Sequence, residues 1–210
     1  MTLRFIYFNF PFWRAEVSRL ALHIGKIPFE DVRPTGEMFR AMKAAGELPY
    51  GQLPVLDING TRIGQSVAIA RYCGKRAGLY PEGDALAEIR VDELLNTVNQ
   101  ISNLMSASMR EKDPDKKAAL RTELGTETLP RWLGFLEARL KLNAPSDYFV
   151  GDSMTVADLA VWRLMDWLTG GILDGIPSTL ADNQSALLKH QKTIGDRDDI
   201  RKWMSDHYGK

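Results

Sequence analysis

Short apolar runs alternate with helical patterns through the first 78 residues. Residues 3–7 form an apolar run typical of a strand, residues 13–25 place their apolar positions on one helical face, and residues 29–33 alternate like a second strand. A strand, a helix and a second strand in this order predict a βαβ unit with parallel strands. The other predicted elements here are a helix at 38–45, strands at 53–58 and 62–65 joined by an Asn59-Gly60 turn, and a helix at 66–78. We therefore predict an α/β domain with the order βαβ–α–ββα.

The pattern becomes helical almost throughout after residue 84. Proline and glycine at 79–84 indicate a linker. Pro130 predicts a kink in the second long helix, and Thr155 with Asp158 forms a relative of the capping box. The predicted helices cover residues 85–109, 113–142, 156–170, 184–192 and 197–206. The expected organisation is an α/β domain at 1–78, a linker at 79–84 and an all-helical domain at 85–210.

Composition narrows the function classes. Lys plus Arg and Asp plus Glu both number 27, so the chain lacks the basic excess of a nucleic-acid binder. One cysteine, Cys73, excludes an internal disulfide, and with three histidines it argues against a structural zinc site. No run approaches the ~20 apolar residues of a membrane span, and the N-terminus has no leader pattern. We expect a cytoplasmic protein with no metal, nucleic-acid or membrane partner.

Candidate binding groups gather around two positions. Pro54 opens a predicted strand, where proline has no N–H to give to the ladder. The preceding Pro49-Tyr50-Gly51 turn is compatible with a cis Leu53–Pro54 bond, which would turn the Leu53 backbone outward to pair with an extended peptide. Gln65-Ser66 begin a helix, whose unpaired N–H groups attract a carboxylate.

Three further residues suggest an anionic ligand. Tyr7 ends the first strand, at the edge where open α/β sheets bind ligands. Arg14 begins a helix, where a cation opposes the helix dipole and suggests a partner anion. Lys43 lies on the short helix at 38–45. Each residue alone is more often an ordinary packed or solvated side chain, so the signal is in their order and spacing.

The order and spacing resemble a known family, the cytosolic glutathione transferases. The motifs that carry the resemblance are Tyr7-Phe8-Asn9, Arg14-Ala15-Glu16, Gly51-Gln52-Leu53-Pro54-Val55-Leu56, Gln65-Ser66-Val67-Ala68-Ile69-Ala70-Arg71-Tyr72 and Thr155-Val156-Ala157-Asp158. The chain is most similar to the sigma-type branch, which includes glutathione-dependent prostaglandin D synthase and the S-crystallins. The resemblance covers the whole chain and is strongest over residues 1–80. It implies a thioredoxin-like N-terminal domain, an all-helical C-terminal domain, glutathione as cosubstrate and a homodimer.

The resemblance also implies roles for individual residues. Tyr7 matches the tyrosine whose hydroxyl bonds the glutathione sulfur, and Arg14 matches an arginine near that sulfur. Lys43 matches the lysine that meets the glycine carboxylate. The groups implied to hold the cysteinyl and γ-glutamyl units are the Leu53 backbone between Gln52 and Pro54, and the pair Gln65 and Ser66.

Two positions depart from the branch. Phe39 stands where the branch often has a tryptophan donor to the glycyl end. Gln100 lies where the branch often has a carboxylate that crosses the dimer to the γ-glutamyl amine, so its contribution from the partner subunit would be uncharged.

A second-substrate pocket and the reaction class complete the expectations. Aromatic and methionine side chains suit an adaptable apolar pocket, and we expect it to draw on Phe12, Trp13, Met105, Met109 and Trp162. Conjugation of the glutathione thiolate to hydrophobic electrophiles, as in detoxification, is the predicted function. A glutathione-dependent isomerase like the prostaglandin D synthases, and a catalytically weak ligand carrier or structural protein, are the alternatives. No Cys or Ser lies at 8–16 to act as a nucleophile instead, and Cys73 is expected to be a buried packing residue.

Overall fold

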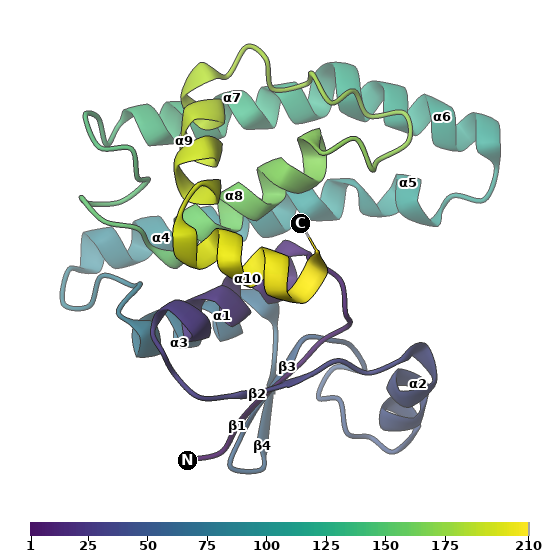
Figure 1. Ribbon diagram of the computed structural model, residues 1–210. Helices are drawn as coiled ribbons and strands as arrows, with labels where there is room; N and C mark the ends of the chain where they lie inside the picture. The colour runs from purple at the N-terminus through teal and green to yellow at the C-terminus, as the bar shows by residue number, and fades with distance from the viewer. Residues whose placement is uncertain (210) are drawn as a thin grey trace.

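A four-stranded mixed sheet forms the base of the computed structural model, which describes residues 1–209 (Figure 1). β1 (Leu3–Ile6) pairs parallel with β2 (Glu30–Val32) and antiparallel with β3 (Val55–Ile58). β3 pairs antiparallel with β4 (Thr61–Gly64), which gives the strand order β2-β1-β3-β4. The parallel pair and the hairpin agree with the sequence prediction.

Helices of the same domain flank this sheet. α1 (Trp13–Ile24) and α3 (Ser66–Ala77) pack together above the strands in Figure 1, and α2 (Gly36–Ala44) lies off to one side. Nine of the twelve residues of α1 are buried, because the sheet covers one side of the helix and α8 covers the other. The core therefore continues from the sheet into the helical domain.

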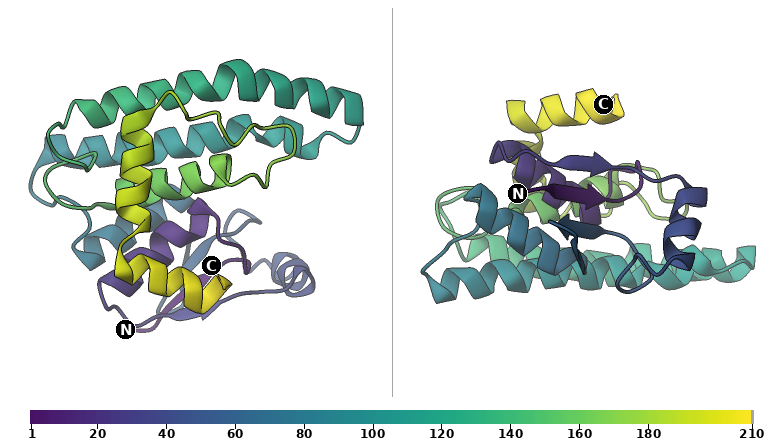
Figure 2. Two further views of the ribbon diagram at one scale, coloured as in Figure 1. Left: turned by 45° about the horizontal axis from the view of Figure 1, so that its top comes forward. Right: turned by 90° about the horizontal axis from the view of Figure 1, so that it is seen from below.

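The C-terminal domain is helical. Its elements are α4 (Ala85–Leu104), α5 (Ser106–Arg110), α6 (Pro114–Glu123), the π-helical η1 (Leu124–Thr128), α7 (Leu129–Lys141), α8 (Val156–Thr169), α9 (Ser185–Gly195) and α10 (Asp198–Tyr208). α8 lies at the centre and contacts α1, α4 and α9. α10 returns to the sheet domain on the side opposite α4 (Figure 2). The predicted fold class, a thioredoxin-like domain followed by an all-helical one, is confirmed.

The start of α8 forms the predicted capping box. The Thr155 amide donates to Asp158 at 2.7 Å, and the Thr155 hydroxyl accepts from the Ala157 amide at 3.2 Å. Asp158 also accepts from the Phe149 amide at 2.9 Å and lies 3.1 Å from Nε2 of His190. This buried carboxylate thus joins the loop before α8 to α9.

Two long helices differ from their predictions. The helix predicted to reach residue 109 ends at Leu104, and α5 starts anew after Met105. The Ser108 hydroxyl donates to the Met105 carbonyl at 2.9 Å, a local bond that competes with a continuous helix. The predicted kink at Pro130 takes the form of η1 just before it, since proline has no N–H for the preceding turn. Among the described residues, no helix is long and apolar enough to cross a membrane.

Candidate active site

A polar cavity of about 400 Å³ opens between the two domains. One wall comes from the loop before β3 and the start of α3, and the other from the end of α4 and from α5. Its lining residues are Arg14, Tyr50, Gln52, Leu53, Pro54, Gly64, Gln65, Ser66, Asn99, Asn103, Ser106 and Arg110. The cavity thus unites segments nearly a hundred positions apart.

Six residues singled out from the sequence line this cavity. They are Arg14, Gln52, Leu53, Pro54, Gln65 and Ser66. The Leu53–Pro54 peptide is cis. Within residues 1–209 the Leu53 amide has no hydrogen-bond partner, so its N–H is free to pair with an extended ligand.

The start of α3 makes one end of the cavity suited to an anion. Ser66 is the first helical residue, and the first turn of α3 holds no acidic side chain. Gln65 before it has φ 76°, a left-handed conformation that is uncommon outside glycine and often marks a functional position. The free N–H groups and positive dipole end of this twelve-residue helix favour a carboxylate there.

Tyr7 follows β1 and is only 8% exposed. Burial raises the pKa of its phenol above the ordinary value, while the positive charges of Arg14 and Arg19 only partly oppose that rise. The hydroxyl therefore keeps its proton at neutral pH and is able to donate a hydrogen bond.

Arg14 brings a positive charge to the cavity. Its guanidinium donates to the side-chain oxygens of Asn99 at 2.7 Å and Asn103 at 2.8 Å, and it lies over the Trp13 ring at 5.0 Å. Burial lowers the pKa of Arg14, and the group stays charged at neutral pH. Because amide oxygens are neutral, the charge is not cancelled. The cavity lining holds a second cation, Arg110, and no carboxylate.

Four predicted glutathione contacts lie outside the cavity lining: Tyr7, Phe39, Lys43 and Gln100. Phe39 packs edge-on against Phe8 at 5.3 Å, and Phe8 packs edge-on against Tyr7 at 5.7 Å. The Cε atom of Lys43 lies 3.4 Å from where a Cβ on Gly51 would be, next to the Gln52 loop. Gln100 is exposed on α4.

The sequence reading missed the half of the cavity that belongs to α4 and α5. Asn99, Asn103, Ser106 and Arg110 are spaced at helical intervals of three and four residues. This row of polar residues on one face was a signal in the sequence. The row continues from α4 into the short α5, across the break at Met105.

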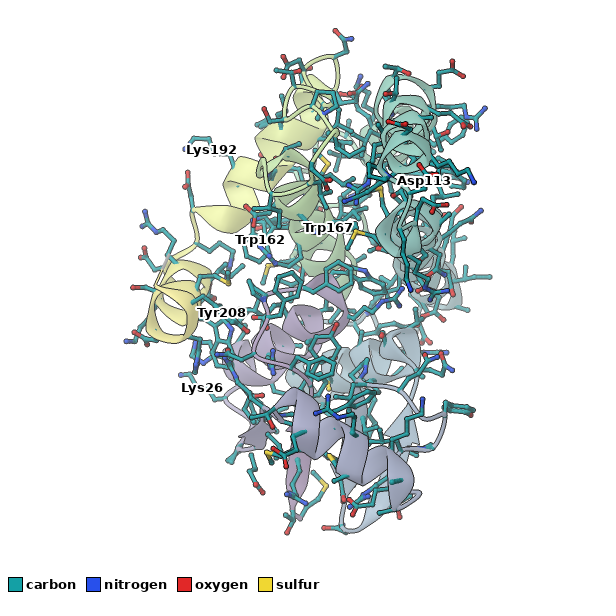
Figure 3. All side chains as sticks on the ribbon, turned by 90° about the vertical axis from the view of Figure 1, so that its right-hand side faces the viewer. Lys26, Asp113, Trp162, Trp167, Lys192 and Tyr208 are labelled. Atoms are coloured by element: carbon teal, nitrogen blue, oxygen red, sulfur yellow. The ribbon has the colours of Figure 1, made fainter. Side chains whose placement is uncertain are left out.

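The structure corrects three expectations about the second-substrate pocket. Trp13 and Met105 are 1% and 0% exposed and pack in the core, so they offer a ligand no surface. Trp162 lies against Gly195 and lines a separate groove of about 570 Å³ among α8, α9 and α10 (Figure 3). Apolar packing from both domains explains all three positions. Phe12 is half-buried and packs edge-on against Trp167 at 5.0 Å, and Met109 is 56% exposed.

The fold and cavity define a class of protein, a thioredoxin-like domain joined to a helical domain with a polar cavity between the two. Family models of the glutathione S-transferase N-terminal and C-terminal domains match residues 3–75 and 99–207. The chain therefore belongs to the glutathione S-transferase family of enzymes, which use glutathione as cosubstrate and generally form homodimers.

Individual relatives agree with this membership. A glutathione S-transferase of Plasmodium yoelii yoelii is 33% identical over 73% of this chain and 72% of its own length. The hematopoietic prostaglandin D synthase of Mus musculus is 32% identical, covering 85% of this chain and 86% of the relative. The structure of a prostaglandin synthase D of Nilaparvata lugens is 28% identical and superposes with a TM-score of 0.84 over 98% of both chains. The resemblance to the sigma-like branch is confirmed.

Proposed function

We propose that this protein conjugates the glutathione thiolate to small hydrophobic electrophiles, with Tyr7 as the thiol activator. The observation that carries the proposal is the convergence of the Leu53 edge, the α3 N-terminus and Arg14 on one cavity. We assign glutathione binding to residues 1–78 and the electrophile wall to the helices after the linker at 79–84.

We assign each of the three units of glutathione to a separate segment of the protein. The γ-glutamyl carboxylate would meet the N-terminus of α3 with Gln65 and Ser66, and the cysteinyl backbone would pair with Leu53. The glycine carboxylate would meet the exposed ammonium of Lys43, where Phe39 adds no donor. In a homodimer, Gln100 of the partner subunit would face the γ-glutamyl amine as a neutral group.

The proposed chemistry starts with the ionised thiol. A free cysteine thiol has a pKa of ~8.5, so little thiolate exists at neutral pH. The protonated Tyr7 hydroxyl would donate to the sulfur anion, and the Arg14 charge would attract it. Lowering the thiol pKa by about two units requires about 2.7 kcal/mol, and one charge-assisted hydrogen bond supplies roughly 1.5–3 kcal/mol. The sulfur then forms a bond to an electrophilic carbon, whose leaving group departs with its electron pair.

The second substrate would bind above the sulfur, between the domains. Phe12 offers a half-buried aromatic surface, and Met109 on α5 offers an exposed flexible one. Of the five residues expected to line the apolar pocket, we keep Phe12 and Met109 in this proposal.

We place the protein in the cytoplasm as a homodimer, and the surface beside the cavity offers a seat for a second subunit. A groove between α3 and α4 shares Gln65 and Asn99 with the cavity, and its apolar lining includes Val67, Ala68 and Tyr72. A second subunit seated on this groove would close the open side of the glutathione site.

Retention on immobilised glutathione, followed by a conjugation assay with a chlorinated aromatic, tests the proposal. We expect retention, elution by free glutathione and turnover. Retention without turnover would favour the carrier alternative, and no retention would refute glutathione binding.

An isomerase is the second candidate, because two of the relatives above are prostaglandin D synthases. Supplying prostaglandin H2 with glutathione separates the two functions, since an isomerase returns glutathione unchanged while conjugation consumes it.

A further inference from the structure

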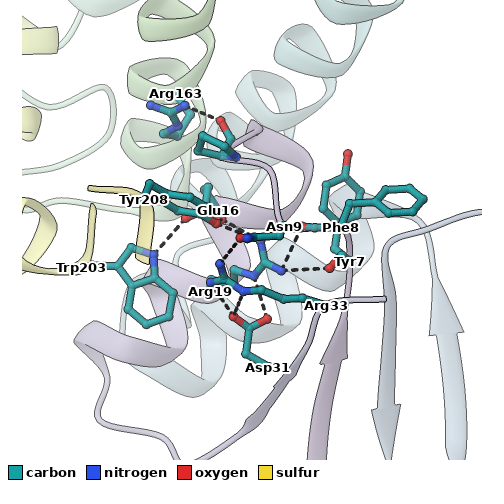
Figure 4. A network of polar contacts seen from close by, with 11 residues as sticks. Tyr7, Phe8, Asn9, Glu16, Arg19, Asp31, Arg33, Arg163, Trp203 and Tyr208 are labelled. Atoms are coloured by element: carbon teal, nitrogen blue, oxygen red, sulfur yellow. Dashed lines mark hydrogen bonds and ion pairs between the residues drawn. The ribbon is translucent and has the colours of Figure 1, made fainter. Parts of the chain in front are cut away.

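A buried polar network connects α10 to α1 (Figure 4). Glu16 is fully buried, and its Oε1 accepts from the Tyr208 hydroxyl at 2.6 Å and from Nη1 of Arg19 at 2.9 Å. Its Oε2 accepts from Nε1 of Trp203 at 2.9 Å. Three donors therefore fix this carboxylate, and two of them come from the last helix of the chain.

Arg19 carries the network to the chain segment that follows β1. Its Nη2 donates to the carbonyl oxygens of Tyr7 at 3.1 Å and Phe8 at 3.3 Å, and its Nε donates to Asp31 at 2.9 Å. Within residues 1–209 the Tyr7 carbonyl has no other hydrogen-bond partner. Figure 4 shows the Tyr7 ring rising from this anchored backbone toward the helical domain.

The network pairs carboxylates with guanidinium groups, since Arg19 contacts Glu16 and Asp31, and Arg33 contacts Asp31. The charged and titratable groups around the segment are Glu16 and Arg19 on α1, Asp31 and Arg33 on β2, His207 and Tyr208 on α10, and Arg14 on the cavity side. Burial and the Glu16 charge raise the pKa of Tyr208 well above its usual range. Burial and Arg33 lower the pKa of His207. Both side chains are therefore mainly neutral at pH 7.

We propose that Trp203 and Tyr208 are positioning residues for Tyr7, acting through Glu16 and Arg19. The proposal rests on the proposed function in one respect, that Tyr7 is the thiol donor. A hydrogen bond weakens steeply when its donor is displaced or misaligned, so the backbone that carries Tyr7 must be held. The C-terminal helix holds it from the side opposite the substrate.

The decisive variant is Tyr208→Phe, which removes one donor to Glu16 and keeps the ring. Asp206→Asn is the matched control on the same helix, because Asp206 is exposed and, among residues 1–209, its carboxylate pairs with the exposed Lys202 at 3.0 Å and not with Glu16 or Arg19. A second variant, Trp203→Phe, removes the indole donor to Glu16 and keeps an aromatic side chain.

Two readouts separate positioning from general stability. The ultraviolet absorbance of the thiolate, titrated with pH, gives the pKa of bound glutathione. We expect Tyr208→Phe to raise that pKa by ~0.5–1 unit and to lower kcat/KM below the pKa by about three- to ten-fold. Hydrogen exchange of the Tyr7 and Phe10 amides, which needs no glutathione, should speed up in the free protein.

The outcomes are distinct. A raised thiol pKa with faster exchange at Tyr7 and Phe10, both absent in Asp206→Asn, supports the proposal. A thiol pKa and exchange rates equal to the wild type in Tyr208→Phe and Trp203→Phe overturn it, even if both variants melt at lower temperature. If the wild type does not lower the thiol pKa, the proposed function fails, and the exchange rates alone decide whether α10 positions Tyr7.

Discussion

At the scale of single residues, the protonation state of Tyr7 decides what its hydroxyl does. Burial raises the phenol pKa, so the hydroxyl is a donor at neutral pH and does not act as a base. A donor aimed at sulfur stabilises the thiolate without itself changing charge.

Tyr7→Phe should lower kcat by about ten- to a thousand-fold while glutathione still binds, because one anion-stabilising donor contributes roughly 1.4–4 kcal/mol. Steady-state kinetics and calorimetric titration of glutathione measure the two effects. Tyr148→Phe, remote from the cavity, is the control. Full activity in Tyr7→Phe would remove Tyr7 from the mechanism.

Cys73 carries the one cysteine thiol of the chain, which could compete with glutathione as the nucleophile. Burial raises the pKa of this thiol to about 12, so it is not a nucleophile at neutral pH. We expect Cys73→Ala to keep conjugating activity within about two-fold and to lower the free energy of unfolding by about 1 kcal/mol through the lost packing. Activity assays and urea unfolding check this, and a large loss of turnover with intact stability would contradict it.

At the scale of elements, local chemistry explains which predictions succeeded. The Asn59-Gly60 hairpin and the Thr155-Asp158 cap depend on residues a few positions apart, so the sequence showed both. The end of α4 at Leu104 depends on how Met105 packs in the core and on the Ser108 hydroxyl, which the apolar periodicity does not reveal. The cavity wall from α4 and α5 was missed although its polar residues recur at helical spacing, because a local pattern does not show which part of the chain faces them.

The cap of α8 should be among the costliest single positions to change. Asp158→Asn places an amide against backbone and hydroxyl donors that the buried carboxylate accepts from, and it should lower the free energy of unfolding by about 2–4 kcal/mol. Asp152→Asn, exposed in the preceding turn, is the control and should cost less than ~0.5 kcal/mol. Urea denaturation measures both, and equal costs would refute the role of the cap.

At the scale of the whole molecule, α1 lies between the sheet and α8, so the two domains share one core. We expect a single calorimetric unfolding transition whose van't Hoff and calorimetric enthalpies agree. Two resolved transitions would show that the domains unfold separately.

Contacts between the two ends of the chain were the hardest to predict from the sequence. Glu16 and Tyr208 are 192 positions apart, and nothing in either local pattern links the two residues. Only the folded chain brings the last helix against the first one.

The two asparagine side chains that accept hydrogen bonds from Arg14 have a consequence for how the rate depends on pH below neutrality. Asn99 and Asn103 do not titrate, whereas aspartates in their place would gain protons on acidification and alter the field at the sulfur. The acidic limb of the rate profile should then report one ionisation, that of the bound mercaptan, with a tenfold fall per pH unit below its midpoint. A steeper limb would mean that a second group takes up a proton over the same pH range as the bound thiol.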